Sequence, residues 1–140
     1  MSLVQLIYVS SATHEQSAAE IKKILDTAVR RNGEYKVTGM LLYSRGSFLQ
    51  VLEGEESAVT ETIDRIRADP RHKDVTILTT EPVSERQFGD WSMAFRGIGA
   101  SDAKDWPGYA PFVEFGFNPE RFGAKPGLAL EMLAAFARQK

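Results

Sequence analysis

The sequence predicts an α+β fold of the ferredoxin-like βαββαβ type, with an added fifth strand and a C-terminal helical extension on the other face of the sheet. Apolar, β-rich runs alternate with two amphipathic helical patterns in the order strand, helix, strand, strand, helix, strand. The opening run is apolar on both faces, which is typical of a central strand covered on two sides. In this topology the first and third strands lie side by side.

The first strand is predicted over Leu3 to Val9, an almost wholly apolar run. Ser17 and Glu20 have the spacing of a capping box, in which each side chain accepts a hydrogen bond from the backbone N–H of the other residue. A helix should therefore begin there, and Gly33 should end it. One face of this helix carries a stripe formed by Ala18, Ile21, Leu25, Ala28, Val29 and Asn32, with Ile24 at its edge.

The stretch from Val37 to Gly54 predicts a β-hairpin, because two apolar runs flank a short segment of turn residues. A second helix is expected between the acidic Glu56 and the helix-breaking Pro70. The β-rich run Val75 to Thr80 then supplies the fourth strand. The buried row of the second helix consists of Val59, Ile63 and Ile66.

The last part of the chain predicts one more strand and one more helix. Asp90 to Gly97 alternates in the manner of a short strand, and Leu128 to Arg138 has the pattern of an amphipathic helix that could cover the open face of the sheet. The expected organisation is a domain over residues 1–97 followed by a C-terminal extension over residues 98–140.

Gln50 conflicts with the apolar pattern around it. Strand alternation places it on the same face as Phe48 and Leu52, in the middle of the third strand. A buried carboxamide without partners costs about 1–3 kcal/mol. A polar partner is therefore expected, and Tyr8 of the adjacent first strand is the candidate.

Composition excludes several classes of function. A net charge of -2 offers no general attraction for nucleic acid, and the absence of cysteine removes disulfides, thiolate metal sites and cysteine nucleophiles. No apolar run approaches the roughly 20 residues of a membrane span, and Met1 to Val9 does not resemble a signal peptide. A cytoplasmic protein is expected. The sequence also contains no phosphate-binding glycine loop and no nucleophile elbow.

The two histidines, His14 and His72, lie in polar or basic segments without a second metal ligand at a recognised spacing, so both are expected at the surface and no metal is expected. A polar set remains for the helix-facing side of the sheet and the nearby helix ends. Each member alone is more often structural, but together they could surround a flat heteroaromatic ligand in an apolar slot. The set comprises Tyr8, Asn32, Gln50, Arg65 and Asp69.

Over about residues 1 to 97 the chain resembles the BLUF domains, which are blue-light sensors that use FAD. The likeness covers several motifs in the same order and is therefore specific. The matching segments are Leu6-Ile7-Tyr8-Val9-Ser10, Asn32, Thr38-Gly39-Met40-Leu41-Leu42-Tyr43, Phe48-Leu49-Gln50-Val51-Leu52-Glu53-Gly54, Asp69-Pro70-Arg71-His72 and Asp90-Trp91-Ser92-Met93.

The resemblance implies where FAD would bind. The flavin ring would lie between the two helices beside Tyr8 and Gln50, with Asn32 on its pyrimidine edge. Apolar contact would come from Ile24, Ile66 and Phe48. Positions near the ring edge, the ribityl chain or the phosphates are Arg65, Asp69, Arg71 and His72, whereas Ala28 and Arg31 stand where other members offer Ser or His.

The resemblance also implies a photochemical function and no enzymatic activity. Tyr8 would give an electron and a proton, and Gln50 would rotate or tautomerise and so rearrange its hydrogen bonds. Trp91 and Met93 would pass this change to the fifth strand and the C-terminal segment. A separate downstream effector protein and a homo-oligomer are the expected partners, with no nucleic acid and no membrane.

Two alternatives stay open from the residues alone. One is a ferredoxin-like metabolite-binding module or acylphosphatase-type enzyme, which would use Arg65 or Arg71 with Asn32 on an anionic ligand. The other is a structural oligomerisation domain, in which Gln50 is satisfied by protein groups alone. The first of these predicts a colourless protein that anions stabilise against heat.

Overall fold

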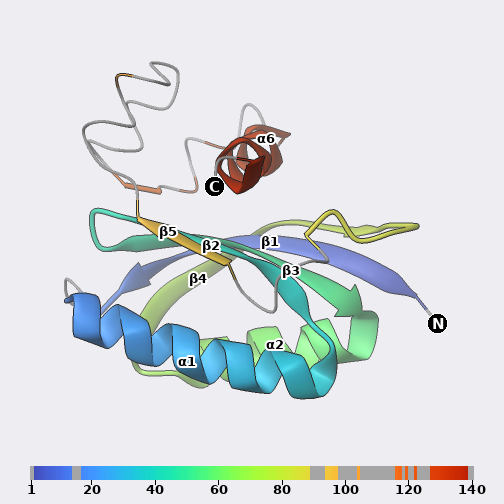
Figure 1. The fold of residues 1–140 in the computed structure, drawn as a ribbon, viewed down its shortest axis with the longest axis horizontal. Helices are drawn as coiled ribbons and strands as arrows, with labels where there is room; N and C mark the ends of the chain where they lie inside the picture. The colour runs from blue at the N-terminus through green and yellow to red at the C-terminus, as the bar shows by residue number, and fades with distance from the viewer. Residues whose placement is uncertain are drawn as a thin grey trace.

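In a computed structural model the protein is a five-stranded sheet with helices on both faces (Figure 1). The structure describes residues 2–13, 17–88, 94–97, 104, 116–117, 119, 122 and 127–138. Helices α1 and α2 lie below the sheet in Figure 1 and α6 lies above it. The elements are β1 Leu3–Ala12, α1 Ala18–Tyr35, β2 Thr38–Ser44, β3 Ser47–Glu55, α2 Glu56–Ala68, β4 His72–Pro82, β5 Ala94–Gly97 and α6 Gly127–Arg138.

The strand order β4-β1-β3-β2-β5 confirms the ferredoxin-like arrangement and the added fifth strand. β1 pairs with β3 and with β4 in antiparallel fashion, β2 pairs with β3 likewise, and β5 joins β2 in parallel. One row of the sheet runs from Tyr8 to Gln50, then to Leu41 and to Phe95. The expected neighbourhood of Tyr8 and Gln50 is therefore present. Residues 90–93 of the predicted fifth strand lie outside the described residues.

The start of α1 agrees with the sequence and its end does not. The Ser17 backbone N–H donates to Glu20 Oε1 at 3.0 Å, and the Glu20 N–H donates to Ser17 Oγ at 3.2 Å, which is the predicted capping box. The prediction that Gly33 ends the helix is wrong, since α1 continues to Tyr35. The left-handed residue that follows the helix is Lys36, with φ of 57°. A glycine permits this conformation but does not impose it.

The β2–β3 hairpin closes through a tight two-residue turn. Arg45 and Gly46 have φ of 50° and 69°, as a type I′ turn requires at both central positions. At its end, Ser47 Oγ donates to the Ser44 carbonyl at 2.5 Å and accepts from the Phe117 N–H at 2.7 Å. A residue from the C-terminal part of the chain is thereby fixed to the hairpin.

Two hydrophobic clusters sandwich the sheet. The cluster toward α1 and α2 includes Leu6, Phe48 and Ile63, together with Tyr8. The cluster on the opposite face contains strand residues and the buried α6 residues Ala129, Met132, Leu133 and Phe136. The C-terminal helix therefore covers the second face, as its amphipathic pattern predicts.

Candidate functional site

A cavity of about 530 Å³ lies between α1, α2 and the sheet. It is of the size of a small-molecule or cofactor site. Residues that the sequence selected supply most of its lining, namely Tyr8, Ile24, Ala28, Gln50, Arg65, Ile66, Asp69, Arg71 and His72. The sequence analysis missed Thr27, Leu41, Thr62, Ala68 and Pro70.

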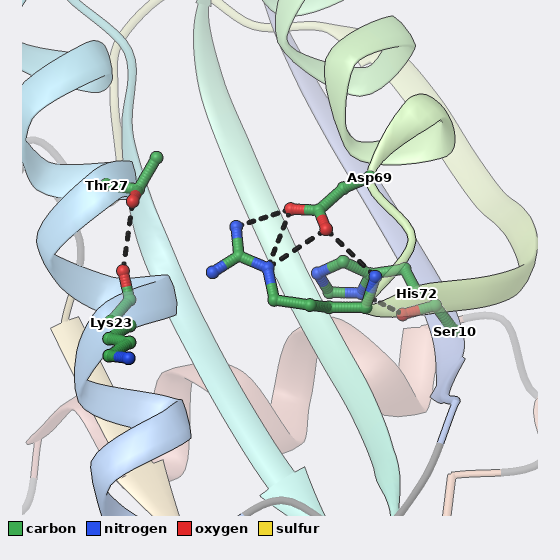
Figure 2. A network of polar contacts seen from close by, with 6 residues as sticks. Ser10, Lys23, Thr27, Asp69 and His72 are labelled. Carbon is green, nitrogen blue, oxygen red and sulfur yellow. Dashed lines mark hydrogen bonds and ion pairs between the residues drawn. The ribbon is translucent and has the colours of Figure 1, made fainter.

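Some of the missed cavity residues could have been selected from the predicted strand register or from helical spacing. Leu41 pairs with Gln50 across the hairpin, so the register alone places it beside the expected site. Thr62 lies one helical turn before Ile66, and its hydroxyl donates to the Ala58 carbonyl at 2.8 Å. Thr27 likewise donates to the Lys23 carbonyl at 3.0 Å, as Figure 2 shows. Threonine is a weak helix former, and its presence in a helix does not by itself predict that the residue lines a cavity.

Tyr8 and Gln50 form the polar centre of the cavity. Both side chains are buried, and the Tyr8 hydroxyl donates a hydrogen bond to Gln50 Oε1. Burial raises the pKa of the Tyr8 phenol far above its usual range, and the negative charge of Asp69 acts in the same direction. Tyr8 is therefore a neutral phenol that holds its proton toward a carboxamide oxygen.

Asp69 and Arg71 form an ion pair where α2 ends and β4 begins. The guanidinium Nη2 of Arg71 lies 2.5 Å from Asp69 Oδ2, and the Arg71 backbone N–H donates to Oδ1 at 2.9 Å. Burial acts to raise the pKa of Asp69, but the hydrogen bonds and charge of Arg71 outweigh it and lower that pKa. Arg65, which stands four residues before Asp69, has its Nη2 3.5 Å from Thr62 Oγ1. The cavity thus has charged groups beside α2.

His72 is buried, so the prediction of a surface histidine is wrong. β4 begins at His72 and pairs it with Ala12 of β1, which extends beyond the predicted strand. His72 Nδ1 shares a hydrogen bond of 3.0 Å with Ser10 Oγ, and its ring lies 4.8 Å from that of Phe48. Figure 2 shows His72 and Asp69 in front of the sheet, across from Thr27 of α1.

Some of the residues selected from sequence are not placed at the cavity. Phe48 is fully buried on the same face of the sheet, but the cavity lining does not include it, so its contact with a ligand stays a prediction. Arg31 and Asn32 belong to α1, and their side chains lie outside the described part of the chain. Trp91 and Met93 also lie outside it.

The cavity fits a flavin by the chemistry of its walls. Ile24 of α1 and Ile66 of α2 give it apolar sides from two helices. The Tyr8 and Gln50 pair gives it a donor and acceptor centre. A flavin cofactor has a flat ring with a polar edge and an anionic tail, so its site needs apolar walls, hydrogen-bonding groups and charged groups together. Among the described residues no cluster of His, Asp and Glu could hold a metal ion, and no helix there is long and apolar enough to cross a membrane.

Residues 3–94 match the model of the BLUF family, described as sensors of blue-light using FAD. The chain belongs to the BLUF family. The family description names sensors of blue light that use FAD, which agrees with the sensor role that the sequence resemblance implies. Neither the acylphosphatase-type enzyme nor the structural oligomerisation domain accounts for this match.

Similar proteins include both fused and short BLUF proteins. Photoactivated adenylate cyclase subunit beta of Euglena gracilis is 42% identical over 93 residues, which are 66% of this chain but only 11% of that protein. The structure of BlrB, a BLUF protein in its dark state, has a TM-score of 0.77 at 29% identity and covers 97% of both chains. BlsA in its photo-activated state has a TM-score of 0.78 at 27% identity, over 94% of both chains.

The buried histidine of this BLUF domain predicts a loss of stability in mild acid. Burial lowers the pKa of His72, with Asp69 opposing and Arg71 reinforcing the shift. Below about pH 6.5 the unfolded chain therefore takes up a proton that the folded chain resists, and the free energy of unfolding falls. His72→Gln should reduce this fall, measured by urea unfolding at about pH 7.5 and about pH 5.5.

The matched control is His14→Gln, which removes the other histidine and should keep the pH dependence of the original chain. The lowered pKa of Asp69 contributes only below its unfolded value near pH 3.8, outside this window. An equal loss of stability in His72→Gln and in the unsubstituted protein would contradict the assignment to His72.

Proposed function

We propose that this BLUF domain is a blue-light photoreceptor that binds FAD in the cavity between α1 and α2. The buried hydrogen bond from Tyr8 to Gln50 at this cavity is the observation that supports it most directly. Residues 1–97 would form the flavin domain and residues 98–140 its C-terminal extension. The packing of α6 on the far face of the sheet supports an extension that is coupled to that domain.

The chain supplies the electron donor and the first proton acceptor. When bound, the flavin supplies blue-light absorption and, once excited, a strong oxidant. Tyr8 gives up one electron, and its oxidised phenol, far more acidic than a phenol of pKa about 10, loses its proton. The hydrogen bond already directs that proton to Gln50 Oε1.

Gln50 converts this transfer into a change of hydrogen bonding. Its amide has an acceptor end and a donor end, so either rotation or tautomerisation presents a different group to Tyr8 and to the neighbouring strands. Because Gln50 is buried, each new pairing must be satisfied inside the protein. A single side chain therefore provides two states without refolding of the sheet.

The remaining roles are those that the family resemblance implies, and most of these residues line the cavity. Ile24, Ile66 and Ala28 would contact the ring, and Phe48 would support it from the core of the same face. Asn32 of α1 would bind the pyrimidine edge of the ring, and Arg31 would be a further cofactor-binding residue of α1, at a position where other members offer Ser or His. The groups at the end of α2, which would meet the ring edge, ribityl chain or phosphates, are Arg65, Asp69, Arg71 and His72.

The output is proposed to leave through β5. Trp91 and Met93 precede β5 and would transmit the state of Gln50 to it and to the C-terminal segment. The recipient would be a separate effector protein in the cytoplasm, reached by a homo-oligomer of this chain. The fused relatives named as photoactivated adenylate cyclases support an effector coupled to a BLUF domain.

An absorption spectrum before and after blue light tests the proposed function. The purified protein should be yellow, its flavin bands should shift slightly to the red under blue light, and the shift should reverse in the dark. Chromatography of the released pigment would distinguish FAD from FMN and riboflavin. A protein purified without flavin that also fails to take it up would refute the proposal.

A further inference from the structure

Glu53 is a fully buried carboxylate on the face of β3 that points away from the cavity. Its neighbours in the alternation, Leu49 and Val51, belong to the cluster beneath α6, whereas Gln50 lines the cavity. A carboxylate without partners is very costly in such a place. The flavin chemistry proposed above makes no use of Glu53.

Three donors converge on this carboxylate. Gln5 Nε2 of β1 lies 2.8 Å from Oε2, the Gln87 backbone N–H lies 3.0 Å from the same oxygen, and the Phe88 backbone N–H lies 2.6 Å from Oε1. Two of the three donors are thus successive backbone amides of the chain between β4 and β5. The carboxylate fixes a segment of main chain, independently of the side chains at residues 87 and 88.

Arg86 completes the attachment. Its Nη1 donates to the Glu53 carbonyl oxygen at 2.9 Å and to Thr38 Oγ1 of β2 at 3.0 Å. Segment 86–88 is therefore bound to β3 by the side chain and the main chain of Glu53, and to β2 by Thr38. The same segment leads along the chain to Trp91, Met93 and β5.

β3 connects this attachment to the cavity. Gln50 and Glu53 are three residues apart, about 10 Å along one strand. β3 is paired with β1 and with β2 over this whole interval, so a shift of its backbone at Gln50 also moves Glu53. A movement of Glu53 relative to segment 86–88 changes the length or the angle of these hydrogen bonds, and a hydrogen bond weakens as it departs from its favoured geometry.

We propose that Glu53 is a positioning residue of the light response, which ties the strand carrying Gln50 to the segment leading into β5, and that light loosens this tie. The inference rests on the proposed photoreceptor function. In this proposal the change at Gln50 reaches β5 through hydrogen bonds on the α6 face of the sheet. This route is in addition to the one proposed through Trp91 and Met93.

Amide hydrogen exchange of the flavin-loaded protein, resolved by residue in the dark and under continuous blue light, tests the proposal. The exchange rates of the Gln87 and Phe88 amides should rise roughly tenfold in the light, as loss of one hydrogen bond to a charged group predicts. Amides in the β1–β3 ladder should keep their rates and serve as the internal reference.

Two variants separate this role from simple structural support. Glu53→Gln should keep the red shift but exchange rapidly at residues 87 and 88 in the dark, so that light adds little. Arg86→Gln removes only the two bonds of the guanidinium and should alter the rate of dark recovery severalfold. Its control is Arg67→Gln, an exposed arginine of α2, which should recover as the unsubstituted protein does.

The outcomes distinguish this inference from the proposed function. A protein without a light-induced shift refutes the photoreceptor itself. A normal red shift with equal exchange at Gln87 and Phe88 in dark and light overturns the inference alone, and this measurement needs no variant if Glu53→Gln fails to fold. Dark recovery of Arg86→Gln at the rate of Arg67→Gln would also overturn it.

Discussion

Replacement of Tyr8 by phenylalanine is expected to leave flavin bound and to abolish the light-induced red shift. The ring stays in place to fill the core, but the hydroxyl that donates to Gln50 Oε1 is lost, and with it the proton that accompanies electron transfer. Absorption spectra recorded before and after blue light measure the effect. Loss of this buried hydrogen bond should also lower the free energy of unfolding by about 1–3 kcal/mol.

Tyr43→Phe is the matched control for this experiment. Tyr43 lies on β2, is only partly buried and packs on Phe48 with ring centroids 5.0 Å apart. It does not line the cavity, so its variant should keep the red shift and the recovery rate. A normal photocycle in Tyr8→Phe would show that Tyr8 is not the electron donor.

Replacement of Gln50 by leucine is expected to have an effect of similar size on the light response. Leucine fits an apolar strand position between Phe48 and Leu52, so the fold and the cavity should persist. It has neither an acceptor for the Tyr8 proton nor a second orientation that differs in hydrogen bonding. Light should therefore produce no stable red-shifted state, as seen in spectra taken seconds after illumination.

The variant Gln50→Glu tests whether the light response needs the amide donor of Gln50. A glutamate still accepts a hydrogen bond from Tyr8 but has lost the amide donor, so it should bind flavin and also fail to form the red-shifted state. Gln139→Leu makes the same chemical change as Gln50→Leu at a residue that follows α6 in the sequence, and it is the control for that variant. A reversible red shift in Gln50→Leu would remove the amide from the mechanism.

Two features of the fold that depend on local signals, a helix start and a hairpin turn, were predictable from the sequence. The Ser17 and Glu20 capping box and the type I′ turn at Arg45 and Gly46 involve residues within a few positions of each other. Gln50 was predictable for a different reason, because strand alternation gave its face and the βαββαβ order gave its neighbour. The pair at the centre of the site therefore follows from pattern and topology together.

Apart from the end of α1, which lies two residues beyond Gly33, the main errors and omissions involve contacts between distant segments. His72 reads as part of a basic turn, and its burial depends on the extension of β1 to Ala12, which the local pattern does not show. Glu53 reads as an ordinary alternating polar residue, while two of its partners are backbone amides more than thirty positions later. Backbone donors carry no residue-type signal, so pattern reasoning cannot select the carboxylate that binds them.

The position of β5 at the edge of the sheet also bears on how easily this proposed output strand can move. Among the described strands β5 has four residues and pairs with β2 alone, whereas the opposite edge strand β4 has eleven residues. Displacing β5 breaks few hydrogen bonds and leaves the pairings of β1, β3 and β4 intact. The proposed output strand β5 can therefore move while the β1–β3 pairing that holds Tyr8 beside Gln50 stays in place.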